Sequence, residues 1–269
     1  MVGLHANYAG SIPGYYDHCL GPAWFHAFAA DLVQRLPANP SADVLELACG
    51  TGIVTQRLRE RLDPSLRLVG SDISKAMLDF ARNKRIEREG IEWREADAAS
   101  LPFEDGEFGA VVCAFGIMFV PDKRAAMSEA RRVLKKGGTL LFNVWDRLER
   151  NRHVALTADV MEDLFPGDQE LSFRRLYEMH DPALLRALVA EAAFQEVRIE
   201  PKQVEIRGVS ARSVATGLIR GSPRSLLIEK RGASLDEVVD RVSTALEKAA
   251  GGAMYVGTAS AMVVEARAV

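Results

Sequence analysis

Residues 43–52 constrain the fold more than any other part of the chain. The apolar run 44–47 ends in a series of small residues, Ala48 to Gly52. Apolar positions then recur at helical spacing over residues 54–62, with charged residues between them. An apolar run that stops at glycines and leads into a helical period predicts a buried strand, a tight turn and a helix.

The glycines of this turn predict a ligand site. A residue without a side chain lets a ligand approach the backbone closely. A dinucleotide fingerprint carries three glycines, whereas Ala48, Gly50 and Gly52 occupy the corresponding positions here at tighter spacing. We therefore expect a ligand other than a dinucleotide pyrophosphate, and a turn that only packs helix against sheet is the alternative.

Two acids follow the next predicted strands. The strand at 66–72 ends in Asp72, about 20 residues beyond the glycine turn, where nucleoside-binding sheets place an acceptor for ribose hydroxyls. Ser74 is the candidate N-cap of the next helix, although Asp72 could serve that purpose instead. A third strand at 91–98 contains Asp97 near its end, and the alternative for Asp97 is an ordinary turn acid.

The remaining pattern continues the alternation of strands and helices. Residues 109–115 are apolar throughout, as in a parallel strand that is covered on both faces. A helix at 125–134 then ends in two lysines and two glycines, which are C-terminal signals. Further helices are expected at 22–36, 155–165, 182–192, 211–220 and 235–249, and further strands at 139–145, 194–206 and 261–266.

The run Glu46–Gly52 resembles the first motif of class I S-adenosylmethionine (SAM)-dependent methyltransferases, with Ala48 in place of the usual first glycine. The ordered elements from Tyr16 to Trp145 resemble the same family, in its small-molecule branch (type 11/25-like). This resemblance implies that Glu46 holds the ammonium group of SAM and Asp72 its ribose. It implies the following cofactor residues: Tyr16, Glu46, Ala48, Cys49, Gly50, Thr51, Gly52, Asp72, Ile73, Met77, Asp97, Ala98, Phe115 and Gly116.

The expected fold is α/β, a Rossmann-like seven-stranded, mostly parallel sheet with helices on both faces and a late helical insertion. We expect a single domain over 1–269, with 1–36 as a segment and helix that cover the cofactor and 208–252 as an insertion or lid. The expected substrate pocket contains Tyr8, Phe119 and Trp145.

Composition limits the partners. A net charge of −3 provides no overall attraction to nucleic acid, and Arg220, Arg224, Lys230 and Arg231 form only a modest basic cluster that is typical of a solvated face. Three widely spaced cysteines predict no disulfide framework and no metal site. No apolar run is long enough to span a bilayer, so we expect a cytoplasmic monomer or homodimer without membrane contact.

The predicted reaction is transfer of the SAM methyl group to an oxygen, carbon or nitrogen atom of a small acceptor, which leaves S-adenosylhomocysteine (SAH). Positioning and desolvation can supply much of the acceleration, so a general base is optional. His18 and His153 are the weak candidates for one. The alternatives are a SAM-binding protein that does not methylate, such as a cyclase or a sensor, and a methyltransferase acting on RNA or protein.

Overall fold

The computed structural model describes residues 8–37, 42–84 and 90–269. The chain forms two compact units. The first, here called the helical unit, comprises the described residues of Met1–Ala27 together with Asp146–Glu178 and Gln203–Ser260. The second, the sheet unit, comprises the described residues of Phe28–Trp145 together with Met179–Lys202 and Ala261–Val269. Each unit is described separately.

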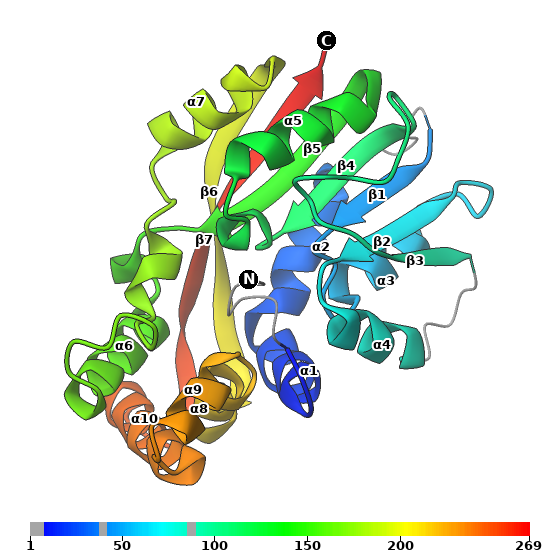
Figure 1. Ribbon diagram of the computed structural model, residues 1–269. Helices are drawn as coiled ribbons and strands as arrows, with labels where there is room; N and C mark the ends of the chain where they lie inside the picture. Colours follow the sequence, from blue (N-terminus) through cyan, green and yellow to red (C-terminus); the bar gives the residue numbers. More distant parts are fainter. Residues whose placement is uncertain (1–7, 38–41, 85–89) are drawn as a thin grey trace. The chain divides into compact units, whose positions relative to one another are not determined.

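A seven-stranded sheet with the order β3-β2-β1-β4-β5-β7-β6 organises the sheet unit (Figure 1). The pairs β1–β2, β2–β3, β1–β4 and β4–β5 are parallel, and β5–β7 is antiparallel. The predicted fold class is therefore confirmed. The strands are β1 (Val44–Leu47), β2 (Leu68–Asp72), β3 (Ile91–Glu95), β4 (Phe108–Ala114), β5 (Leu134–Trp145), β6 (Phe194–Ser210) and β7 (Met254–Ala268).

Helices cover both faces of this sheet. In Figure 1, α5 and α7 lie on one face, and α2, α3 and α4 lie against the other. Side-chain caps fix three helix starts, because Ser74, Asp122 and Asp181 each accept a hydrogen bond from a backbone N–H of the first turn. The helices are α2 (His26–Arg35), α3 (Ile53–Arg61), α4 (Lys75–Asn83), α5 (Lys123–Val133) and α7 (Pro182–Glu191).

The strand register brings the carboxyl ends of β1, β2 and β4 together at the predicted ligand site, and we call this end of the sheet its carboxyl edge. Glu46 of β1 lies opposite Gly70 of β2 and Val112 of β4. The chain order reverses between β1 and β4, and in open α/β sheets ligands bind beyond the carboxyl ends of the strands at such a reversal. Buried apolar side chains of β1, β4 and β5 form the core behind this edge, so the edge rests on a rigid base.

The helical unit contains closely packed helices. A π-helix, η2 (Tyr16–Phe25), contacts α8 through two glycines: a Cβ at Gly217 would lie 2.3 Å from Leu20, and one at Gly221 would lie 2.9 Å from the Tyr16 nitrogen. Larger residues at these glycines would therefore separate the two helices. The unit contains α1 (Ile12–Tyr15), η2, η4 (Leu148–Arg150), α6 (Arg152–Leu164), η5 (Arg174–Tyr177), α8 (Ala211–Arg220), α9 (Arg224–Lys230) and α10 (Leu235–Ala250).

Several boundaries differ from those predicted. The helix expected from residue 22 belongs to a continuous helical stretch that begins at Ile12, since Pro13 lies in the first turn of α1, where proline is tolerated, and Pro22 lies inside the π-helix η2. The third strand ends at Glu95 because the chain turns at Asp97, and α9 was not predicted. The single domain over 1–269 and the special roles of 1–36 and 208–252 stay predictions.

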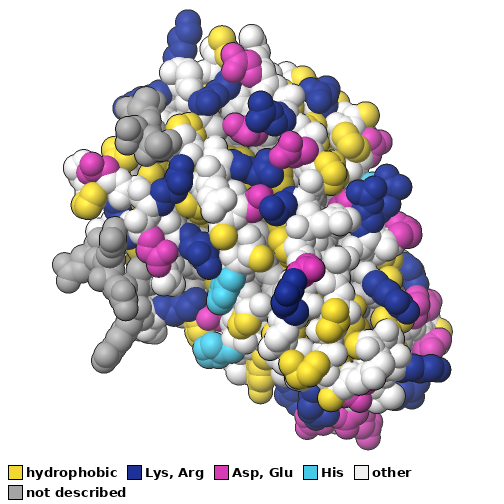
Figure 2. All heavy atoms as spheres, turned by 180° about the vertical axis from the view of Figure 1, so that it is seen from behind, with side chains coloured by type: hydrophobic (Ala, Val, Ile, Leu, Met, Phe, Trp, Pro, Cys, Tyr) yellow, Lys and Arg dark blue, Asp and Glu magenta, His cyan; other side chains and the backbone are white. Residues whose placement is uncertain are grey.

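Two surface properties bear on possible partners. On the face shown in Figure 2, Lys and Arg side chains are interspersed with Asp and Glu side chains. Among the described residues, none of the helices has the length and apolar character needed to cross a membrane.

Candidate functional site

The turn after β1 has the backbone geometry of a ligand site. Ala48, Gly50 and Gly52 all have positive φ angles, of 51°, 54° and 80°. A Cβ at Gly50 would meet no atom of the described residues within 4 Å, so with respect to these residues the space beside it is open. Gly52 forms the N-cap of α3, where a Cβ would lie 3.0 Å from the Trp93 ring. The turn therefore exposes backbone at Gly50 and is tightly packed at Gly52.

Asp72 joins this turn to the end of β2. Its carboxylate accepts hydrogen bonds from the backbone N–H groups of Gly50 and Ser74, both at 2.8 Å. Burial raises the pKa of Asp72, and these N–H groups partly offset that effect. The hydroxyl of Ser74 caps α4, so Asp72 is not needed as the helix cap. The Ile73 N–H also donates to this carboxylate, which has roughly four acceptor positions, so an acceptor position remains for a ligand.

Glu46 is a second acid at the same edge, and its side chain is 1% exposed. The Thr55 hydroxyl donates to its carboxylate at 2.5 Å. Burial raises the pKa of Glu46 to about 8, and the nearby charge of Asp72 contributes in the same direction. Two neighbouring buried acids produce a strongly negative site once ionised, which favours a cationic ligand.

The hydroxyl of Thr51 is buried and has no hydrogen-bond partner among the described residues. A buried polar atom without a partner is uncommon in folded proteins, and it is often satisfied by a ligand or a water molecule. This hydroxyl lies in the same turn as Gly50. The turn therefore contains a buried polar group without a described partner at Thr51, in addition to the open space at Gly50.

The residues predicted to contact the adenosine differ in their exposure. Ile73 directly follows β2, and its apolar side chain is 47% exposed, whereas Met77 is buried. Asp97 is exposed, and one carboxylate oxygen accepts from the Ala99 N–H at 2.8 Å. One oxygen of Asp97 thus stabilises the turn, and its second oxygen is the one that could accept a hydrogen bond from adenine, as the sequence predicts.

The turns after β1 and β4 touch each other. Phe115 has a φ of 54°, and its N–H donates to both the backbone and the side-chain oxygen of Asn143, at 3.1 and 2.9 Å. A Cβ on the next residue, Gly116, would lie only 2.3 Å from the Cβ of Ala48. Two non-glycine residues in left-handed conformations thus meet at this edge, and such strain is typical of functional sites.

Aromatic side chains form one wall at the end of β4. The ring of Phe115 lies 4.2 Å from that of Trp145 and 5.2 Å from that of Phe28, measured between centroids. Phe28 and Trp145 are 5.9 Å apart. The structure therefore brings Phe115 and Trp145 together, while Phe119 nearby in sequence is half-buried.

Sequence reasoning missed two polar residues that support this edge. Asn143 holds the Phe115 turn, and Thr55 holds the Glu46 carboxylate. A signal was present for Asn143 and Thr55, because each is a polar residue at an apolar position of its element.

Tyr8, Tyr16, His18 and His153 belong to the helical unit, so their predicted roles beside the cofactor or the substrate stay predictions. Tyr16 stacks on Phe25 at 4.9 Å and has Tyr8 at 6.4 Å, edge to face. His18 is exposed.

His153 is fully buried, with the ring of Trp24 at 4.6 Å. Burial lowers its pKa to about 3, so it is neutral at physiological pH and a poor proton acceptor. We therefore do not include His153 in the proposed reaction.

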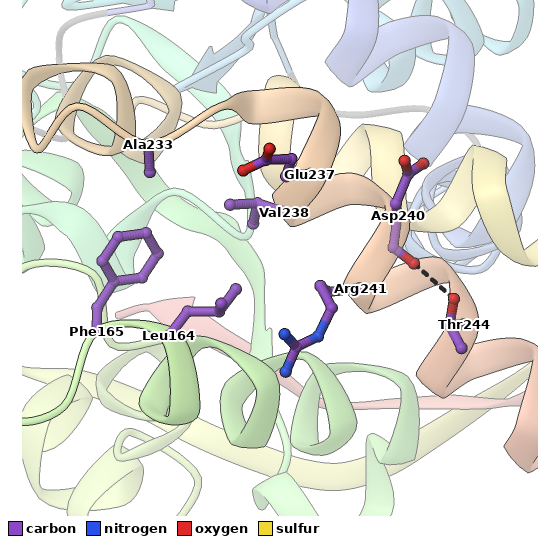
Figure 3. A pocket seen from close by; sticks show the side chains of 8 residues that line it. All are labelled: Leu164, Phe165, Ala233, Glu237, Val238, Asp240, Arg241 and Thr244. Carbon is purple, nitrogen blue, oxygen red and sulfur yellow. Dashed lines mark hydrogen bonds between the residues drawn. The ribbon is translucent and has the colours of Figure 1, made fainter.

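A surface groove of about 430 Å³ lies between α6 and α10 of the helical unit (Figure 3). Exposed Glu237, Asp240 and Arg241 face it, and the Thr244 hydroxyl donates to the Asp240 carbonyl at 2.8 Å. None of the residues predicted from the sequence to form the site lines this groove.

Comparison with known proteins identifies the family. The family description "Methyltransferase domain" matches residues 45–142, which include the β1 turn, Asp72 and the β4 turn. A ubiquinone/menaquinone biosynthesis C-methyltransferase from Hahella chejuensis is 41% identical over 175 residues, which cover 60% of this chain and 70% of that protein. The chain spans about half the length of other curated relatives, which are demethylmenaquinone methyltransferases.

Solved structures share the fold at low sequence identity. A phosphoethanolamine N-methyltransferase from Haemonchus contortus, in complex with SAH and phosphomonomethylethanolamine, is 16% identical with a TM-score of 0.62 over 99% of this chain and 60% of its own. The [4+2]-cyclase SpnF is 19% identical with a TM-score of 0.54, over 91% of this chain and 81% of its own. Together with the relative from Hahella, these findings show that the chain is an enzyme of the class I SAM-dependent methyltransferase family.

Proposed function

We propose that this methyltransferase transfers a methyl group to a ring carbon of a small, electron-rich aromatic acceptor of the quinol type. The open backbone at Gly50 between the buried acids Glu46 and Asp72 is the observation that carries the SAM site. The acceptor class rests on the relative from Hahella chejuensis, whose name specifies C-methylation in quinone biosynthesis.

The residues present fit SAM. Glu46 accepts from the ammonium group, directly or through water, and ionises as it does so. Asp72 accepts from a ribose hydroxyl through its remaining acceptor position while it keeps its bonds to Gly50 and Ser74. The unpartnered hydroxyl of Thr51 is available to a polar group of the ligand.

The adenine contacts are assigned to the residues after β2 and β3. The exposed apolar side chain of Ile73 packs against the adenine base and is thereby removed from water, and the buried Met77 lies behind Ile73. The free oxygen of Asp97 accepts from the exocyclic amine, and the Ala98 N–H donates to a ring nitrogen.

SAM, when bound, supplies a methyl group on a positively charged sulfur that is already a strong electrophile. The chain contributes position and a dry environment. The β4 turn at Phe115 and Gly116 would border the methyl group, and the buried, mutually packed rings of Phe115 and Trp145 keep this end of the sheet apolar. Holding the two reactants in line supplies much of the acceleration. As the methyl–sulfur bond breaks, the ring carbon bonds to the methyl group, and the ring carbon then releases its proton to water, so no dedicated base is required.

The experiment is a methyl-transfer assay with isotope-labelled SAM and three acceptors: a reduced naphthoquinone that lacks the ring methyl, a simple phenol and an aliphatic amine. We expect label on a ring carbon of the quinol and one SAH per methyl transferred, detected by mass spectrometry. Label on oxygen or nitrogen would refute the carbon assignment. Tight SAM binding with no transfer to any acceptor would favour the non-methylating alternative.

A further inference from the structure

Arg224 is a buried cation that has no counter-ion among the residues that the structure describes. It is the first residue of α9, and 5% of it is exposed. One guanidinium nitrogen donates to the Ser172 carbonyl at 2.7 Å, and the guanidinium lies 4.5 Å from the centre of the Phe173 ring. Its Nε has no hydrogen-bond partner, and no ion pair joins it to any carboxylate in the described ranges.

The neighbouring arginines behave differently. Arg220 pairs with Asp236 at 2.7 Å, and Arg231 pairs with Asp168 and Glu170, both at 2.7 Å. The sequence predicted a solvated basic cluster here, and for Arg224 that prediction is wrong. An uncompensated buried charge is strongly unfavourable, so a folded protein that keeps one has a reason beyond stability.

The groups around Arg224 do not neutralise it. Burial lowers the pKa of Arg224 to about 10, so the guanidinium stays charged at neutral pH. Tyr8 and Tyr177 are the titratable side chains that interact with it electrostatically. Tyr177 is buried, which raises its pKa far above the usual range and keeps it a neutral phenol. These phenols therefore leave the charge of Arg224 unneutralised, and its direct contacts are the Ser172 carbonyl and the Phe173 ring, both within the helical unit.

We propose that Arg224 binds the anionic oxygen of a small aromatic molecule, a carboxylate or a phenolate, at a site within the helical unit. The N–H donors of a guanidinium are rigidly arranged, with a spacing that suits hydrogen bonds to such oxygens. The Nε donor of Arg224 has no acceptor among the described residues. The Phe173 ring offers an apolar surface to the body of the ligand. The anion site is built from residues of the helical unit alone and does not depend on the proposed function.

Calorimetric titration of the full chain with 2-naphthoate, and with the neutral isostere 2-naphthamide, tests the site directly. We expect 2-naphthoate to bind at least about 10-fold more tightly than the amide. 2-Naphthol covers the phenolate case, because its absorption spectrum shows whether it binds in ionised form. Equal affinities for naphthoate and naphthamide, together with un-ionised naphthol, would overturn the proposal without any variant being needed.

Arg224→Met removes the charge and keeps much of the volume, and Arg231→Met is the matched control at the other end of α9. We expect Arg224→Met to lose naphthoate affinity at least about 10-fold while its melting temperature stays equal or rises, because an unpaired buried charge has been removed. Arg231→Met should keep wild-type affinity. A lower melting temperature with unchanged naphthoate binding would assign Arg224 a structural role and overturn the proposal.

A parallel titration with SAH distinguishes failure of the anion site from failure of the proposed function. SAH binding without naphthoate binding refutes the anion site alone. Naphthoate binding without SAH binding refutes the proposed function and leaves the anion site standing.

Discussion

Replacing Gly116 by alanine tests how the β1 and β4 turns fit together. The added Cβ would lie 2.3 Å from the Cβ of Ala48 and 2.9 Å from the sulfur of Cys113. Neither distance is tolerable, so one turn must move. The Ala48 Cβ is attached directly to the backbone and cannot rotate away, which means that the backbone of the SAM-binding turn has to shift.

Overpacking of a rigid core costs about 1–3 kcal/mol. We therefore expect Gly116→Ala to lower the free energy of unfolding by about 2 kcal/mol, which is a fall in melting temperature of roughly 4–8 °C for a chain of this size. Ala48→Gly removes the opposing methyl group and also relieves a left-handed alanine, with φ of 51°. Because the glycine adds entropy to the unfolded chain, this single change should stay within about 1 kcal/mol of wild type.

The double variant isolates the contact. If the two Cβ atoms clash, Ala48→Gly should restore at least about 1 kcal/mol to Gly116→Ala, with the residual loss coming from Cys113. Urea unfolding of the four proteins, followed by circular dichroism, gives the coupling free energy. Additive effects, with no rescue of Gly116→Ala by Ala48→Gly, would refute the described contact between the two turns.

Three further predictions follow from the site and its surroundings. Gly50→Ala should weaken SAM binding at least about 10-fold, because its methyl group fills the open space of the site. Gly137 also has a positive φ and no described atom within 4 Å of an added Cβ, so each of the two alanine variants should lose ~1 kcal/mol of stability. Gly137→Ala should leave the affinity for SAM unchanged. Glu46 has a pKa of about 8 in the folded protein, above its unfolded value. SAM affinity measured by calorimetry should therefore rise from pH 6 to 8 as Glu46 loses its proton, while the free energy of unfolding should fall between about pH 4.5 and 8. Glu46→Gln should remove both trends. The opposite sign holds for His153, whose pKa falls from 6.5 to about 3 on folding, so stability should decline as pH drops below 6.5 and His153→Leu should show a shallower decline in thermal melts.

Much of the fold was predictable because the parallel sheet leaves a strong sequence pattern. The apolar run at residues 109–115 belongs to β4, and the glycine turn, Asp72 and Ser74 lie where strand ends and caps were expected. These features depend on a few neighbouring residues. The strand order could be expected only from the resemblance, since pairing between distant strands is not encoded locally.

The missed features depend on residues far apart in the sequence. Arg224 reads as a surface residue of a basic cluster, and only packing of its helix against Ser172 and Phe173 buries it. The π-helix at Tyr16–Phe25 was missed as well, and it packs against α8 where Gly217 permits a close approach. The predicted roles of Tyr8 and Tyr16 beside the cofactor stay predictions for the same reason, because local pattern does not determine how distant segments meet.

The central claim is that the edge formed by Glu46, Gly50 and Asp72 binds SAM. Calorimetric titration of the full chain with SAM and SAH, with NAD as the control ligand, tests it most directly. We predict micromolar binding of both sulfur nucleosides and none of NAD, and loss of SAH binding in Gly50→Ala but not in Gly137→Ala. Undetectable binding of SAM and SAH by the folded wild-type protein, or equal binding by the two glycine variants, would contradict the assignment of this edge.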